Sequence, residues 1–151
     1  MLKNYTSSVP ADRSISFIEK TLAQHGASMI VKMYDDQGEV VAIAFEMECK
    51  GTKLAFRLPS QIAACAKTLE ANLPRRARPE TIRKVGEQAA RTAWKILADW
   101  TDAQMAMIDL SQVEMLQVFL PYVYDHSRNQ TFYERIKERG YKALLPAGSQ
   151  E

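Results

Sequence analysis

The sequence predicts an α+β fold: a three- to four-stranded antiparallel β-meander packed against helices, with a helical C-terminal half. Over 29–58, apolar residues recur at every second position, and two short turns that contain glycine divide this stretch into three strands. After residue 60, apolar residues recur at helical spacing instead. Strands and helices that occupy separate parts of a chain are typical of α+β folds.

The segment before the sheet is expected to form an extended stretch and then a helix. Residues 4–9 are polar and are followed by a proline, which biases the residue before it away from helix, so they are a candidate edge strand. A helix is expected over about 14–25, because Ser16 and Glu19 have the spacing of a capping box and a glycine follows its end.

The alternation over 29–58 gives the sheet two different faces. One face is expected to pack against the helices, and its bulky apolar residues are Met29, Val31, Met33, Val41, Ile43, Phe45, Met47, Leu54, Phe56 and Leu58. The other face has small residues at its centre and polar or charged residues around them, namely Lys32, Tyr34, Ala42, Ala44, Glu46, Glu48, Lys53, Ala55 and Arg57. This second face either packs under another part of the chain or lies open as a shallow platform for a ligand, a strand or a partner.

Four helices are expected after the sheet. The first occupies 60–74, and the loop 74–79, with a proline at each end, is too rich in arginine to be helical throughout. The long helix over 80–109 has the most regular apolar stripe of the chain. Two shorter helices begin at predicted capping boxes over 111–114 and 131–134.

Length and composition indicate one globular domain. The chain has 151 residues, of which 46% are hydrophobic and 25% charged, and we expect the domain to span 1–145 with a disordered tail over 146–151. No stretch approaches the ~20 apolar residues of a membrane span, and the N-terminus lacks the apolar segment of a signal peptide. Cys49 and Cys65 are expected to be reduced thiols. We therefore expect a cytoplasmic protein without a membrane partner.

Concentrated positive charge indicates a nucleic-acid site, although the net charge of +2 is too small to indicate one by itself. Arginine stays charged and can bind phosphate oxygens in bidentate fashion, and Lys84, Arg91 and Lys95 would share one face of the long helix. Glu87 interrupts that row, so a merely solvated helix face is the alternative interpretation. The predicted nucleic-acid-binding residues are Lys32, Tyr34, Arg57, Arg75, Arg76, Arg78, Arg83, Lys84 and Arg91.

Aromatic side chains would allow such a site to stack on the bases of a single strand. The candidates are Tyr34, Tyr122, Tyr124 and Tyr133. For Tyr122 and Tyr124 the alternative is a phenol that is hydrogen-bonded at the rim of the domain. Trp94 fits the apolar stripe and is expected in the core, whereas Trp100 points in another direction and is a candidate for an edge or oligomer contact.

No catalytic or metal motif is present in the sequence. His25 and His126 have no neighbouring residues that resemble a triad, and the histidines and cysteines lack the paired short spacings of zinc sites. There is also no glycine-rich phosphate loop. We expect a protein that is not an enzyme and that has no metal or cofactor. A ligand pocket between sheet and helices, holding His25 or His126, is the least favoured of three hypotheses.

Several short runs resemble a family of small, uncharacterised proteins from bacteriophages, prophages and other mobile elements. The runs are Val9-Pro10, His25-Gly26-Ala27, Tyr34-Asp35-Asp36-Gln37-Gly38, Phe56-Arg57-Leu58-Pro59, Ala93-Trp94-Lys95 with Ala103-Gln104, and Phe119-Leu120-Pro121-Tyr122. The resemblance covers most of the chain and implies a small accessory protein in the host cytosol, but no catalytic residue. In the order of its elements alone, the chain is also similar to the core of phage single-strand annealing proteins.

The leading hypothesis is therefore an accessory protein of a phage or mobile element that binds nucleic acid, preferentially single-stranded. The alternative is a protein-interaction module that inhibits a host system or forms a homo-oligomer. Its contact surface would be the small-residue sheet face together with Trp100, Met105 and Met107, because tryptophan and methionine are enriched at interfaces.

Overall fold

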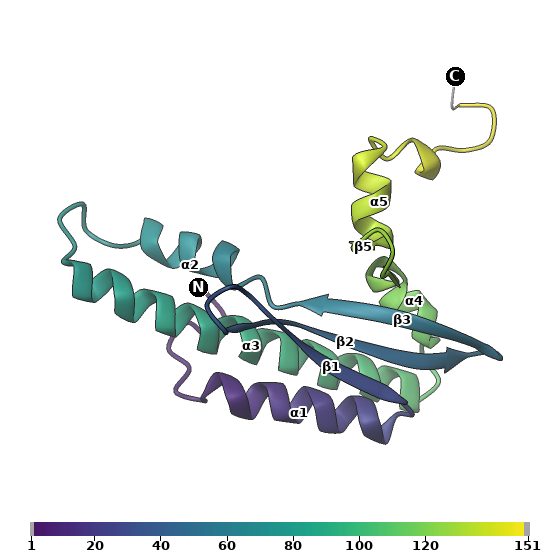
Figure 1. Ribbon diagram of the computed structural model, residues 1–151, viewed down its shortest axis with the longest axis horizontal. Helices are drawn as coiled ribbons and strands as arrows, with labels where there is room; N and C mark the ends of the chain where they lie inside the picture. The colour runs from purple at the N-terminus through teal and green to yellow at the C-terminus, as the bar shows by residue number, and fades with distance from the viewer. Residues whose placement is uncertain (1, 150–151) are drawn as a thin grey trace.

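The computed structural model describes residues 2–149 and confirms the α+β class (Figure 1). The first half of the chain forms, in order, α1 (Ala11–Gln24), β1 (Met29–Tyr34), β2 (Val40–Cys49), β3 (Thr52–Pro59) and α2 (Ile62–Ala71). The second half forms α3 (Pro79–Asp109), α4 (Met115–Phe119), the 3₁₀ turn η1 (Leu120–Tyr122), β4 (Tyr124–Asp125), β5 (Gln130–Thr131), α5 (Phe132–Glu138) and the 3₁₀ turn η2 (Lys142–Leu144). The tail that we expect over 146–151 lies partly outside the described residues.

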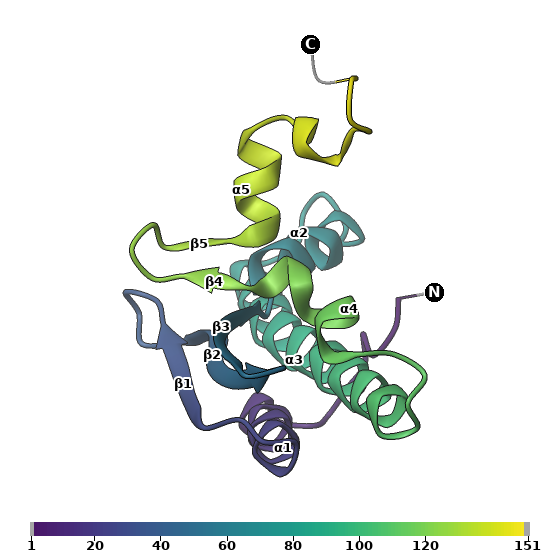
Figure 2. The same ribbon diagram turned by 90° about the vertical axis from the view of Figure 1, so that its right-hand side faces the viewer.

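The sheet is a meander of order β1-β2-β3, with one face against α1 and α3 (Figures 1 and 2). We call the opposite side the outer face. The hairpin of β4 and β5 lies over this outer face, and α5 continues away from it (Figure 2). Helix α2 packs along the first part of α3, and together with their connecting loop they form an arm that extends beyond the sheet (Figure 1). No helix in the described part of the chain has the length and hydrophobicity needed to cross a bilayer.

The core lies between the sheet and the helices α1 and α3, and the short helix α4 closes one side of it. The largest fully buried side chains include Trp94, Phe45, Phe56 and Phe119, which confirms the prediction that Trp94 belongs to the core. The Phe119 ring centroid lies 6.0 Å from that of Phe45 and 6.1 Å from that of Phe56. The sheet and α4 are thus joined through one cluster of rings.

Strand β1 presents the opposite face to the one expected from its alternation. The pairs Ile30↔Phe45 and Lys32↔Ile43 place Ile30 and Lys32 on the side of the helices. Their neighbours along the strand, Met29 and Val31, therefore point outward, and these two side chains are 54% and 47% exposed. The prediction that Met29, Val31 and Met33 face the core was wrong. Because nearly every residue of this short edge strand is apolar, its alternation does not select a face, and the backbone register with β2 decides it.

Residues 4–9 do not form the expected edge strand but a series of turns that crosses α3. Asn4 has a φ of 58°, and its amide donates to Asp99 Oδ2 at 2.9 Å. The Thr92 hydroxyl donates to the Asn4 carbonyl at 3.0 Å, and the Gln88 amide donates to the Ser7 carbonyl at 3.1 Å. Polar side chains of α3 thus donate hydrogen bonds to two backbone carbonyl groups of this segment.

One of the three predicted capping boxes is confirmed. Thr131 and Glu134 form the expected capping box at α5, in which each side chain accepts from the backbone N–H of the other. At α4 the box is formed by Glu114 and Gln117, so the expected start at residue 111 was wrong. Helix α1 begins directly after Pro10, earlier than expected, and the predicted box over 16–19 lies inside it.

Candidate nucleic-acid interface

The structure divides the nine predicted binding residues into separate groups. One group occupies the tip of the α2–α3 arm, residues 72–84, and consists of Arg75, Arg76, Arg78, Arg83 and Lys84. Arg57 and Tyr34 border the outer face of the sheet. Lys32 lies on the side of α1, and Arg91 lies further along α3 beneath the N-terminal segment. The nine residues therefore do not form one continuous surface.

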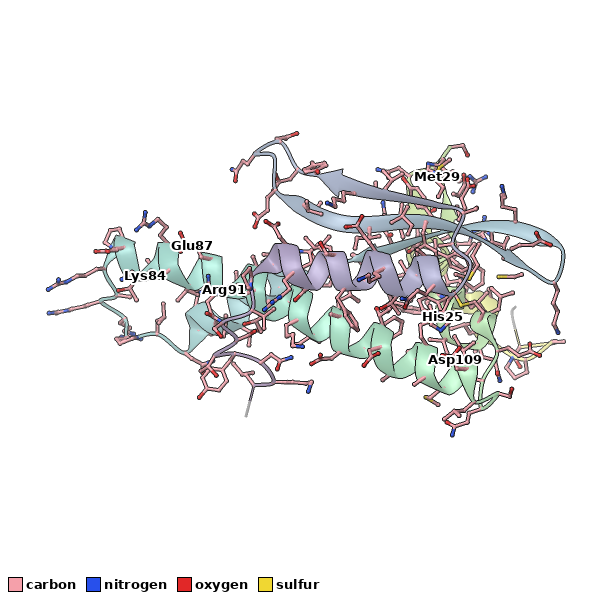
Figure 3. All side chains as sticks on the ribbon, turned by 90° about the horizontal axis from the view of Figure 1, so that it is seen from below. His25, Met29, Lys84, Glu87, Arg91 and Asp109 are labelled. Carbon is pink, nitrogen blue, oxygen red and sulfur yellow. The ribbon has the colours of Figure 1, made fainter. Side chains whose placement is uncertain are left out.

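The arm tip combines exposed cations with few neutralising partners. Helix α2 ends at Ala71 and α3 begins at Pro79, so the three loop arginines lie on a connection that neither helix covers. All five cations of the tip are exposed. Within residues 2–149, only Lys84 among them has a carboxylate partner, Glu80 Oε1 at 3.7 Å. Figure 3 shows nitrogen-tipped side chains that fan outward from this end of the molecule, beside the labelled Lys84.

The predicted row of cations along α3 is interrupted by contacts with neighbours on the same helix. Lys95 Nζ lies 3.0 Å from Asp99 Oδ1, and Arg91 Nη2 donates to Gln88 Oε1 at 2.7 Å. Burial alone would raise the pKa of Asp99, but its hydrogen bonds from Asn4 and Lys95 and its attraction to Lys95 and Lys3 outweigh burial and lower it. The expected continuous positive face of the helix is therefore interrupted beyond the arm tip, and Figure 3 shows Lys84, Glu87 and Arg91 in this order along α3.

Arg57 binds other residues of the chain. Its guanidinium donates to Asn129 Oδ1 at 3.0 Å and to Glu134 Oε1, and it lies 4.7 Å from the centroid of the Tyr124 ring. The Arg57 side chain is 15% exposed. Burial alone would raise the pKa of Glu134, but hydrogen bonds from Thr131 and the charge of Arg57 lower it. These contacts join the outer face of the sheet to the C-terminal segments.

Three of the four candidate tyrosines border a single cleft. The cleft has a volume of about 790 Å³ and lies between the outer face, the start of α2 and α5. Its aromatic residues are Tyr34, Tyr122 and Tyr133. We call it the tyrosine cleft. Tyr124 lies beneath Arg57 instead, and its hydroxyl donates to Asn129 Oδ1 at 2.7 Å.

The small-residue face of the sheet is partly covered and partly borders this cleft. Ala42 and Ala44 are both buried. Ala44 and Ala55 line a small cavity with His126, whereas Ala42 lines the tyrosine cleft. The burial of both alanines supports the packed interpretation of this face, and the open-platform interpretation stays a prediction.

The surface expected for a protein-interaction module is not assembled. Met105 is buried in the core. The Trp100 ring packs edge-on against Phe119 and Tyr122, with centroid distances of 5.3 and 5.7 Å. Besides Tyr34, the exposed large apolar side chains of the sheet are instead Met29 and Val31 of β1, which the sequence interpretation assigned to the core.

His25 and His126, the alternative candidates for a pocket between sheet and helices, lie on opposite sides of the sheet. His25 ends α1, and its Nδ1 donates to the Thr21 carbonyl at 2.8 Å. Its Nε2 lies 2.9 and 3.0 Å from the two carboxylate oxygens of Asp109, at the end of α3 (Figure 3). His126 packs against the Tyr124 ring on the outer side of the sheet. Within residues 2–149, no group of three or more histidine, cysteine, aspartate or glutamate side chains is placed to hold a metal ion.

The contacts of His25 predict a pH-dependent stability. Its pKa is raised from 6.5, chiefly by the Thr21 carbonyl and then by Asp109, against the effect of burial. Protonation therefore favours the folded state, and this stabilisation is complete below the unfolded value and is lost as the pH rises through the folded one. We expect His25→Gln to lower the free energy of unfolding by about 0.5–1 kcal/mol in mild acid and by less in mild base.

Urea unfolding of wild type, His25→Gln and the matched His126→Gln on both sides of neutrality tests this prediction. The His126 side chain makes no hydrogen bond or ion pair to a described residue, so its substitution should change stability little. A His25→Gln effect that grows as the pH rises would contradict the assigned protonation.

Comparison with known proteins gives no family assignment, since no family model, curated protein or solved structure matches the chain. The resemblance to phage and mobile-element proteins therefore stays a prediction. The function must be argued from the chemistry of the residues.

Proposed function

We propose that the protein binds nucleic acid through the tip of the α2–α3 arm. The observation that carries this proposal is the set of exposed cations at the tip, where Lys84 alone has a carboxylate partner within residues 2–149. Phosphates that are neutralised by such cations release counterions, which provides most of the free energy of sequence-independent binding. The tip extends beyond the sheet, so that a long polyanion can reach it without displacing other elements (Figure 1).

The distribution of charge along the chain supports the same region. Residues 67–87 contain six cations and three carboxylates, whereas the whole chain has a net charge of +2, so the remainder has a net charge of −1. A molecule with this asymmetry approaches a polyanion with its basic end first. Arg57, Lys32 and Arg91 are not part of this proposed surface, because their cationic groups bind other residues of the chain.

Substitution of the three loop arginines tests the proposal. We expect Arg75→Ala/Arg76→Ala/Arg78→Ala to lower the affinity for a labelled oligonucleotide at low salt by about tenfold or more, because the variant can neutralise up to three fewer phosphates. The plot of log affinity against log salt should become less steep by about 0.7 for each phosphate of a single strand that is no longer neutralised. Fluorescence anisotropy over a salt series measures both quantities.

A matched variant removes the same charge from other parts of the molecule. Arg13, Lys20 and Arg139 are exposed and lie in α1 and after α5. Their triple alanine variant should keep the salt dependence of the wild type. Equal losses of affinity in the two variants would show that binding responds only to total charge, and no binding by the wild type at low salt would remove the proposed function.

The wider setting of this proposal, an accessory protein of a phage or mobile element in the cytoplasm, is supported by the sequence resemblance alone. The protein-interaction alternative, with a host protein or a second copy of the chain as partner, is supported by a different observation, the exposed Met29 and Val31 on β1. Strand β1 pairs only with β2 within residues 2–149. The charge asymmetry favours nucleic acid over this alternative.

A further inference from the structure

We propose that the tyrosine cleft holds an unpaired base of the strand whose phosphates bind the arm tip, an inference that rests on the proposed function. Three aromatic rings reach the cleft from the end of β1, from η1 and from the start of α5. Its volume of about 790 Å³ is within the range of sites that enclose small planar ligands. Aromatic rings stack on any base, but only when the base is not already stacked and paired in a duplex.

The three rings differ in how firmly other residues hold them. Tyr122 is braced edge-on by Trp100, with ring centroids 5.7 Å apart. The Tyr133 hydroxyl lies 3.4 Å from that of Tyr141. Tyr34 is 59% exposed, and its side chain has no hydrogen bond or ring contact to a described residue. Tyr122 and Tyr133 thus each contact another aromatic residue, and the Tyr34 side chain is free to turn onto a bound base.

The polar groups of the cleft suit a base that is attached to phosphate. Arg57 is paired with Glu134, so their charges compensate each other. Lys137 also lines the cleft, is exposed and has no carboxylate partner within residues 2–149, which leaves a net positive charge. The side-chain oxygen of Asn129 already accepts hydrogen bonds from Arg57 and Tyr124. The side-chain nitrogen of Asn129 makes no hydrogen bond to a described residue, so this nitrogen is available to donate to a base.

A second groove connects the cleft with the arm. This groove, of about 450 Å³, lies between α2 and α3 and shares Pro59, Ser60, Gln61 and Tyr122 with the tyrosine cleft. It continues along α2 past Cys65 and Leu69 toward the tip. The ten residues of α2 span about 15 Å, a distance that a short oligonucleotide bridges easily.

The test separates base contacts from phosphate contacts. The probes are an oligothymidine of about 20 nucleotides, longer than a typical single-domain site, and an abasic strand with the same number of phosphates. We expect the wild type to bind the oligothymidine about tenfold more tightly than the abasic strand. Tyr34→Ala should remove most of this difference without changing the salt dependence, and Tyr34→Trp should retain it.

Tyr5→Ala is the matched control, because Tyr5 is also exposed but lies in the N-terminal segment away from the cleft. Thermal unfolding of each variant establishes that it is folded before its affinity is compared. Equal affinity of the wild type for the two strands, or an unchanged difference in Tyr34→Ala, would overturn the base-binding inference and leave arm-tip binding intact. Failure of the wild type to bind either strand would remove both proposals.

Discussion

Replacement of Phe119 by alanine is expected to lower the free energy of unfolding by about 3–5 kcal/mol. Phe119 is completely buried and is the one buried residue of α4. Its ring contacts Phe45 and Phe56 of the sheet and Trp100 of α3, with centroid distances of 6.0, 6.1 and 5.3 Å. Truncation would remove these ring contacts together and leave a cavity where the C-terminal segments join the core.

Urea unfolding of Phe119→Ala and of the neighbouring Leu120→Ala measures this effect. Leu120 is 45% exposed, so its truncation should cost less than about 1 kcal/mol. Phe119→Leu should be intermediate, since it keeps part of the buried volume and remains measurable if the alanine variant does not fold. Similar losses of stability at positions 119 and 120 would contradict the central position of Phe119 in the core.

Replacement of Arg57 by alanine is expected to lower the free energy of unfolding by about 2 kcal/mol. The substitution removes the donors to Asn129 and Glu134 and the cation above the Tyr124 ring. The effect should not reach that of a fully buried ion pair, because the Glu134 side chain is half exposed to solvent. Since the pKa of Glu134 is lowered, its stabilising effect is present above its ordinary pKa and is lost as the pH falls through the folded value.

Arg128→Ala is the matched control for Arg57, because Arg128 is exposed and its side chain makes a long ion pair with Asp125, at 3.9 Å. Hydrogen exchange of β4, β5 and α5 should accelerate in Arg57→Ala and not in Arg128→Ala. The prediction fails if both variants unfold at the same urea concentration as the wild type. Arg57→Lys should also leave the salt dependence of oligonucleotide binding unchanged, because the guanidinium of Arg57 is bound within the chain.

The sequence predicted a helix or strand well where its local pattern is compatible with only one structure. The helix over 80–109 was placed almost to the residue, since its apolar stripe is long and Pro79 marks its start. The Thr131–Glu134 box was confirmed for the same reason. Strand β1 was turned the wrong way because all of its residues except Lys32 are apolar or aromatic, so its alternation is weak and the register with β2 decides its orientation.

The candidate site was predictable only in part. The arginines over 75–83 are exposed because two prolines confine them to a loop and the start of a helix, which the sequence shows directly. Gln61, which lines the tyrosine cleft, was not identified, because an isolated glutamine has no local signal. Lys137 also lines it, but in the sequence it lies among residues of both charges that are typical of surface ion pairing. Arg57 resembled the other cations in the sequence and differs from them only through its contacts.

By itself, the sequence determined the α+β class, the three strands, the long helix and the concentration of positive charge at one connection. These features follow from side-chain periodicity, proline and glycine geometry and repulsion between like charges, all of which act over a few neighbouring residues. Only the tertiary structure decided which side of β1 faces the core, that Arg57 is bound by a carboxylate 77 positions away, and that three distant tyrosines surround one cleft. Such pairings depend on how whole elements pack, so their partners are defined only when the chain is folded.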